Sequence, residues 1–148
     1  MSQTQNKISV SPQGEAFPLP ELSDYAAEYE RVKALAEAAR ESGKEVVVVM
    51  GVGFVGAVMA AIVADCEGKD GQPSKFVIGC QRPSTRSFWK IPLLNRGVSP
   101  VKAEDPQVDL LIGRCVLEKK TLIATYNSQV LDLADCVVID VQCDFLKQ

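Results

Sequence analysis

A run of 19 residues without a charged side chain, from Val46 to Ala64, constrains the fold of this chain more than any other feature. On hydropathy alone the run is long enough to cross a bilayer. Its first five residues are Val or Met, which is typical of a buried strand. Gly51, Gly53 and Gly56 then divide the run into a strand, a turn and a helix. No second long apolar segment and no basic flank accompany it, so we expect a strand–turn–helix unit and no membrane span.

Strands and helices are expected to alternate along the rest of the chain. The predicted strands are Glu45–Met50, Lys75–Cys80, Leu122–Thr125 and Cys136–Val141, and the predicted later helices are 88–95, 106–117 and 128–134. The strands are continuous apolar runs, which indicates a parallel sheet covered on both faces. The sequence therefore predicts an α/β fold with a Rossmann-like, doubly wound parallel sheet.

Two segments precede the first strand of that sheet. Residues 1–20 contain four Pro or Gly residues without hydrophobic periodicity, and we expect a flexible leader there. Residues 21–44 are expected to form an extra N-terminal helix that packs onto the sheet edge or onto a partner subunit. The predicted apolar face of this helix consists of Tyr25, Tyr29, Val32, Leu35 and Ala39.

Composition excludes several classes of function. The 148 residues include 16 Lys and Arg against 19 Asp and Glu, a net charge of −3 that argues against general nucleic-acid binding. The chain contains no histidine, which excludes a Ser-His-Asp triad, a Cys-His dyad and a histidine-ligated metal. Its five cysteines form no CxxC motif and are expected to be small buried side chains in a reducing cytoplasm.

The glycine turn carries the strongest functional signal. Gly51, Gly53 and Gly56 form a GxGxxG pattern between a strand and a helix, which is the context that dinucleotide binding requires. In this motif the first glycine permits the turn, the second lets the backbone approach a pyrophosphate, and the third lets the helix pack against the sheet. The N–H groups at the start of the helix then face the phosphates. A purely structural glycine turn is the alternative.

The end of the second strand departs from the usual dinucleotide pattern. An acid normally stands there to bind the adenosine ribose, but this chain has Gln81 followed by Arg82. Five basic and no acidic residues lie between Gln81 and Lys102. This segment is either an ordinary solvated loop or a surface that faces phosphates of the cofactor or of a nucleotide sugar.

Four separated segments resemble, in order, the N-terminal NAD-binding domain of the UDP-glucose/GDP-mannose dehydrogenase family. They are VVVVMGVGFVGAVMA, KFVIGCQR, NRGVSP and LIATYNSQVLDLADCVVIDV. The likeness is greatest to the nucleotide-sugar dehydrogenases of the UDP-N-acetyl-hexosaminuronate type. It covers roughly residues 45–145 and implies that residues 45–148 form a dinucleotide-binding domain.

The resemblance also implies an activity and a set of cofactor contacts. This family oxidises the C6 alcohol of a nucleotide sugar to a carboxylate with NAD, through a cysteine-bound intermediate. The residues that match its cofactor-binding positions are Gly51, Gly53, Phe54, Val55, Gly56, Gln81, Arg82 and Thr125. The family's Val-Pro-Thr-Pro stretch falls on Val141–Asp144, where Cys143 and Asp144 replace Thr and Pro.

The family's nucleophilic cysteine and its catalytic lysine and aspartate belong to a second half that has no counterpart in these 148 residues. We therefore assign no catalytic residue and no metal site. The sheet is expected to be incomplete relative to the family, and the chain is expected to be inactive by itself.

The expected cofactor is NAD, with NADP as the alternative, and the expected substrate of the full-length enzyme is a nucleotide sugar. We further expect a cytoplasmic homo-oligomer that binds neither nucleic acid nor a membrane. Two other functions stay open: a stand-alone NAD(P)-binding or sensing module without catalysis, and a Rossmann-like domain whose glycine loop binds no dinucleotide.

Overall fold

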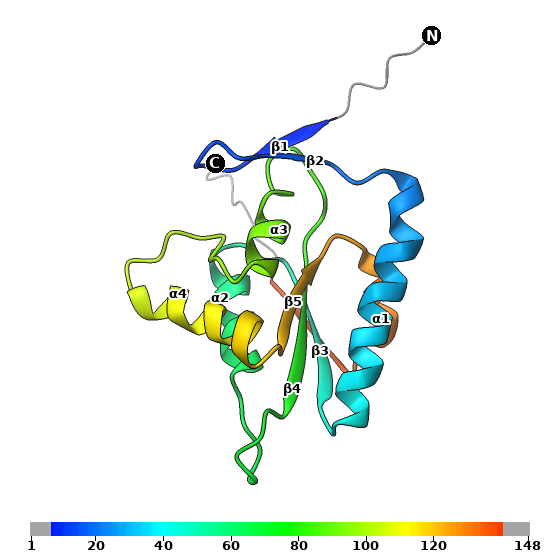
Figure 1. Cartoon of the computed structure of the whole chain (residues 1–148), viewed down its shortest axis with the longest axis vertical. Helices are drawn as coiled ribbons and strands as arrows, with labels where there is room; N and C mark the ends of the chain where they lie inside the picture. The colour runs from blue at the N-terminus through cyan, green and yellow to red at the C-terminus, as the bar shows by residue number, and fades with distance from the viewer. Residues whose placement is uncertain (1–6, 141–148) are drawn as a thin grey trace, which may run out of the picture.

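The main sheet contains four parallel strands in the order β5-β4-β3-β6 (Figure 1). The structure is a computed structural model that describes residues 7–140. The strands are β3 (Glu45–Met50), β4 (Lys75–Cys80), β5 (Leu122–Thr125) and β6 (Cys136–Ile139). The chain moves outward from β3 to β5 and then returns to the other side of β3, which is the strand order of half of a doubly wound sheet. The predicted Rossmann-like α/β fold is confirmed.

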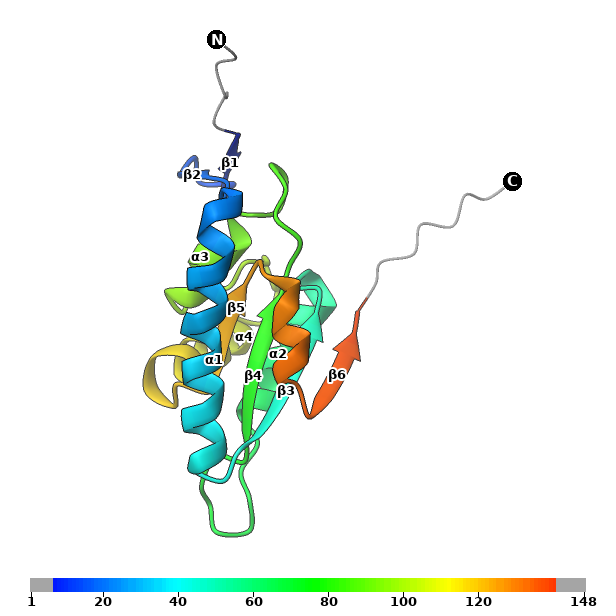
Figure 2. The ribbon, with the colours of Figure 1, turned by 90° about the vertical axis from the view of Figure 1, so that its right-hand side faces the viewer.

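Helices cover both faces of this sheet, because its strands are apolar on both sides. The helices are α1 (Tyr25–Glu41), α2 (Phe54–Ala64), α3 (Lys90–Asn95) and α4 (Pro106–Gly113), with short 3-10 helices at Leu22–Asp24 and Ser128–Leu133 and a π-helix at Arg114–Glu118. One core lies between the sheet and α2, α3 and α4. A second core lies between the sheet, α1 and the 3-10 helix Ser128–Leu133 on the opposite face (Figures 1 and 2).

Helix α1 packs on a face of the sheet, whereas the sequence predicted its edge or a partner subunit. Its fully or nearly fully buried residues are Val32, Ala36 and Ala39. Leu35, which the periodicity placed on the apolar face, is 40% exposed. The small Ala36 side chain brings the helix backbone close to the sheet, so the buried stripe is narrower than predicted and excludes Leu35.

The segment predicted as a leader without secondary structure contains an antiparallel hairpin. Strand β1 (Ile8–Val10) pairs with β2 (Ala16–Pro18). The buried Ser9 Oγ accepts a hydrogen bond from the Trp89 N–H at 3.1 Å. Arg96 pairs with Glu15 at 2.9 Å. These contacts are made to residues far along the chain, and the strands are too short to show an alternating pattern in the sequence.

Strand β6 was predicted to be buried and is instead exposed. Val137 is 44% and Ile139 is 70% exposed, and Cys136 is exposed as well. β6 forms one edge of the sheet beside β3 (Figure 2), and unlike β5 at the other edge it has little helix packed against it. Among the described cysteines, Cys80 and Cys115 are buried as expected, whereas Cys66 and Cys136 are not.

The long uncharged run is divided as its glycines predicted. Its first residues lie in β3, and 11 others form α2. No helix within residues 7–140 has both the length and the apolar character that a membrane crossing needs.

Candidate dinucleotide site at the carboxyl end of the sheet

The turn between β3 and α2 depends on the left-handed conformation of Gly51. Its φ angle is +100°, a value that side-chain-bearing residues rarely adopt. A Cβ atom there would also overlap the carbonyl oxygen of Asp140 at the end of the neighbouring strand. The Gly51 N–H donates to the Cys80 carbonyl at 2.8 Å, so the turn is held between the ends of β4 and β6.

Gly53 marks the one position in this turn where the protein leaves space. A Cβ atom at Gly53 would have no other atom within 4 Å, and its φ of −73° suits any residue. Gly53 is also the N-cap residue of α2, and no side chain in the described part of the chain caps that helix. The N–H groups of the first helical turn therefore face an open surface, where an anionic group can accept them.

Gly56 holds the first turn of α2 against the loop. A Cβ atom at Gly56 would overlap the Gly51 carbonyl oxygen and would lie 2.9 Å from Asp140 Oδ2. Gly56 is itself buried in α2. The three glycines thus have the three different environments that the dinucleotide motif requires: a strained turn, an open face and a close helix packing.

Phe54 and Val55 follow Gly53 and are exposed at 63% and 54%. Both side chains line an apolar groove of about 700 Å³ between α2 and residues 102–105. The predicted contact of these two residues with the cofactor stays a prediction, and their backbone N–H groups at the start of α2 are the groups that could make it. Their side chains point toward the groove.

Gln81 reaches back to the glycine turn from the end of β4. Its side-chain oxygen accepts a hydrogen bond from the Val52 N–H at 3.0 Å. Gln81 was predicted to bind the adenosine ribose. In the structure its side-chain carbonyl oxygen holds the glycine turn in place. The amide nitrogen of Gln81 keeps two donors that can face a ligand.

Arg82 lies at the rim of a cavity of about 500 Å³ on the α1 side of the strand ends. The cavity lining consists of Tyr25, Met50, Cys80, Arg82, Pro83, Tyr126 and Ser128. Arg82 and Arg86 form no ion pair with another described residue, so both guanidinium groups are available to a phosphate. Arg96 in the same basic segment is instead paired with Glu15.

Thr125 does not present its hydroxyl to an open surface. The residue is fully buried at the end of β5, and its Oγ1 accepts from the Asn127 N–H at 3.3 Å. Asn127 in turn caps the following 3-10 helix and donates from Nδ2 to the Tyr25 carbonyl at 2.9 Å. The Thr125 hydroxyl therefore helps to shape the loop that carries Tyr126, and its predicted role near the cofactor stays a prediction.

Sequence reasoning missed Asp140, whose backbone and carboxylate both face the glycine turn. Its N–H donates to the Met50 carbonyl at 2.9 Å, which extends the β3–β6 ladder by one residue. An acid near the carboxyl end of the predicted strand Cys136–Val141 was a usable signal, because the carboxyl ends of neighbouring parallel strands meet at one edge. Residues 141–144, where the resemblance placed further contacts, lie outside the described part of the chain.

None of the described cysteines is an exposed thiol at this edge. Cys80 at the end of β4 is buried, and burial raises the pKa of its thiol to about 11. Burial also raises the pKa of Cys115. The exposed Cys66 follows the end of α2, and Cys136 begins β6, so both lie at the opposite end of the sheet. Within residues 7–140, no group of three His, Cys, Asp or Glu residues is placed to hold a metal ion.

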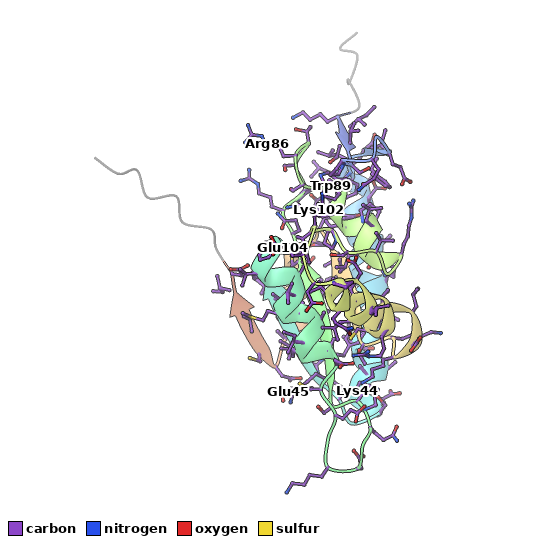
Figure 3. The ribbon with its side chains drawn as sticks, turned by 90° about the vertical axis from the view of Figure 1, so that its left-hand side faces the viewer. Lys44, Glu45, Arg86, Trp89, Lys102 and Glu104 are labelled. Carbon is purple, nitrogen blue, oxygen red and sulfur yellow. The ribbon has the colours of Figure 1, made fainter. Side chains whose placement is uncertain are left out.

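Figure 3 shows how these groups are distributed along the molecule. Four labelled residues lie toward the end of the molecule where α2 begins and the strands finish: Arg86, Trp89, Lys102 and Glu104. Lys44 and Glu45 lie at the opposite end. The free cations, the glycine turn and the 500 Å³ cavity therefore share one end of the sheet, the end at which open α/β sheets bind ligands.

Comparison with known proteins supports the same assignment. No protein-family model matches the chain, and no curated protein matches it. Among solved structures, it is similar to the crystal structure of NDP-N-acetyl-D-galactosaminuronic acid dehydrogenase from Methanosarcina mazei Go1, with 31% identity and a TM-score of 0.61. The match covers 80% of this chain and 23% of that chain. The resemblance to nucleotide-sugar dehydrogenases that the sequence motifs indicated is confirmed.

Proposed function

We propose that this chain is the cofactor-binding portion of a nucleotide-sugar dehydrogenase that oxidises a UDP- or GDP-sugar at C6 with NAD. The observation that carries the proposal is the set of three glycine environments at the start of α2. Gly51 and Gly56 admit no side chain, whereas Gly53 faces open space beside an uncapped helix N-terminus. The 31% identity to a nucleotide-sugar dehydrogenase supports the assignment of this turn to a dinucleotide.

The residues of the site fit a dinucleotide. The N–H groups after Gly53 would hold the pyrophosphate, aided by the dipole of α2. Gln81 would fix the turn through Val52 and offer its amide donors to the adenosine ribose. When bound, the nicotinamide ring supplies hydride transfer. The work of this chain is to hold and orient the cofactor.

The described residues account for binding of the cofactor and not for the oxidation of the sugar. The chain spans 23% of the dehydrogenase it matches, so substrate and activity are assigned here by resemblance. A stand-alone NAD(P)-binding module is the second candidate. The observation that favours it is that residues 7–140 place no exposed thiol beside the glycine turn.

The purified 148-residue chain is expected to produce no NADH from UDP-sugars, although it binds NAD. Covalent oxidation needs a reactive thiolate next to the nicotinamide, and the resemblance places the family's nucleophilic cysteine in a second half that has no counterpart in these 148 residues. Absorbance at the NADH wavelength with a panel of UDP- and GDP-sugars checks this. Steady NADH formation above a no-sugar control would contradict the proposal that this chain binds the cofactor without carrying the catalytic residues.

Cofactor preference gives a second test, through the missing acid at the end of β4. An acid there would accept hydrogen bonds from both ribose hydroxyls and repel a 2′-phosphate, whereas Gln81 carries no charge. We expect wild type to prefer NAD only weakly. Gln81→Asp is expected to raise the ratio of NAD to NADP affinity about tenfold, because the new carboxylate would repel the 2′-phosphate of NADP.

The control for this substitution is Gln81→Asn, because it also shortens the side chain and loses the reach to Val52 but adds no charge. Binding constants for NAD and NADP with all three proteins separate the two effects. A wild type that already rejects NADP a hundredfold, or an Asp variant with the wild-type ratio, would show that Gln81 does not face the ribose.

A further inference from the structure

The 500 Å³ cavity beside the glycine turn is built from two parts of the chain that are distant in sequence. Met50, Cys80 and Pro83 come from the ends of β3 and β4 and the segment that follows. Tyr126 and Ser128 follow β5. Tyr25 comes from the first turn of α1, a helix that precedes the whole strand–turn–helix unit.

Hydrogen bonds from two side chains to backbone carbonyls hold the start of α1 at this place. Asn127 Nδ2 donates to the Tyr25 carbonyl at 2.9 Å, and the Tyr126 hydroxyl donates to the Asp24 carbonyl at 3.4 Å. Both acceptors are main-chain atoms. The start of α1 is therefore held beside the end of β5 without using the Tyr25 side chain.

The side chain of Tyr25 is thus free to shape the cavity with Tyr126. The two rings meet edge to face, with centroids 5.0 Å apart and planes at 75°. Phe88 also packs against the Tyr126 ring, with centroids 6.0 Å apart and planes at 60°. Burial raises the pKa of Tyr126 to about 12, so its ring is neutral and keeps its hydroxyl proton.

The lining has the chemistry that a flat heteroaromatic ring needs. The edge-to-face pair Tyr25 and Tyr126 and the apolar Met50 and Cys80 offer aromatic and van der Waals contact. The Ser128 hydroxyl can exchange hydrogen bonds with ring nitrogens or an exocyclic amine. Arg82 at the rim supplies a positive charge for a neighbouring phosphate or ribose.

The position of the cavity identifies which half of a dinucleotide it serves. It lies at the ends of β4 and β5, where Cys80 and Arg82, the residues on either side of Gln81, contribute to its lining. In doubly wound sheets the residue at the end of the second strand binds the adenosine ribose, so this side is the adenosine side. The β6 side remains for the nicotinamide half.

We infer that Tyr25 is a binding residue for the adenine ring, and that the N-terminal helix α1 is therefore a functional part of the cofactor site. This inference rests on the proposed dinucleotide function. The site then extends beyond the strand–turn–helix unit to α1, which lies outside both the glycine motif and the four segments that resemble the dehydrogenase family.

ADP-ribose titrated calorimetrically into the full 148-residue chain tests the inference. Loss of one base–aromatic contact in Tyr25→Ala is expected to weaken binding about tenfold or more. Tyr25→Leu, which keeps apolar volume against Tyr126 but has no π-face, is expected to weaken it similarly. Tyr25→Phe is expected to stay within about twofold of wild type, because it keeps the ring.

Leu22→Ala serves as the matched control, since Leu22 is 90% exposed on the adjacent 3-10 helix and does not line the cavity. Its affinity and its Tm are expected to equal those of wild type. ADP-ribose affinity that is unchanged in both Tyr25→Ala and Tyr25→Leu would overturn the role of Tyr25 while leaving the proposed function intact. A wild-type chain that does not bind ADP-ribose would overturn both.

Discussion

Replacing Gly53 by valine is expected to abolish dinucleotide binding, with affinity reduced more than a hundredfold, while the chain stays folded. The valine side chain would fill the space next to the N–H groups of α2 that a pyrophosphate needs. Its cost to folding is small, because a Cβ at Gly53 meets no atom within 4 Å and the φ of −73° is unstrained. We expect stability to fall by less than about 1 kcal/mol, because glycine is a better N-cap residue than an apolar one but a weaker one than Ser, Asn or Asp.

Calorimetric titration with NAD, together with thermal unfolding of both proteins, measures the two effects separately. Gly53→Ala is the graded control, since its single methyl group fills less of the same space and should give an intermediate affinity. If Gly53→Val bound NAD as tightly as wild type, the turn would not be a phosphate loop.

Replacing Gly56 by alanine is expected to reduce the stability of the fold strongly, whereas replacing Gly53 reduces mainly the affinity for the dinucleotide. The new Cβ would overlap the Gly51 carbonyl oxygen and crowd the Asp140 carboxylate, and the Gly51 backbone cannot yield without opening the turn. Overpacking of this kind typically costs about 1–3 kcal/mol, and contact with rigid backbone places Gly56→Ala at the upper end.

Urea unfolding followed by circular dichroism checks this expectation, with Gly53→Ala as the matched control. Both substitutions add one methyl group within the same turn, so the comparison isolates the environment of each glycine. Equal unfolding midpoints for the two variants would mean that α2 does not pack on the turn as closely as the structure shows.

The glycine turn was predictable from sequence because its signals are local. The β-branched run Val46–Val49, the glycines and the apolar helix follow one another directly, and each element has its own pattern. The parallel, doubly wound sheet was predictable for a related reason. Strands joined by helices pair in parallel with right-handed crossovers, which leaves few arrangements for four strands.

Contacts between distant residues could not be predicted in this way. Gln81 accepts from Val52 across 29 positions, and Asn127 binds Tyr25 across 102. No local pattern encodes such pairs, because they depend on how the elements pack. For the same reason the sequence placed Gln81 in the ribose slot by counting, yet gave no sign that its oxygen is also tied to the turn.

Burial was misjudged where a segment's neighbours decide it. Cys136–Ile139 is as apolar as β4, yet it is exposed because little helix packs against it, whereas α3 covers β5 at the other edge. The β1–β2 hairpin shows the reverse case: it folds because Ser9 and Glu15 find partners 80 and 81 residues further along the chain.

Chemical-shift mapping of backbone amides during an NAD titration tests the central claim most directly. If the carboxyl end of the sheet holds a dinucleotide at the glycine turn, the largest changes will fall on Gly53, Phe54 and Val55, with further changes at Gln81 and Tyr126. Amides near Lys44 and Glu45, at the opposite end of the sheet, will not move. Saturating NAD that left the Gly53–Val55 amides unchanged would contradict the assignment.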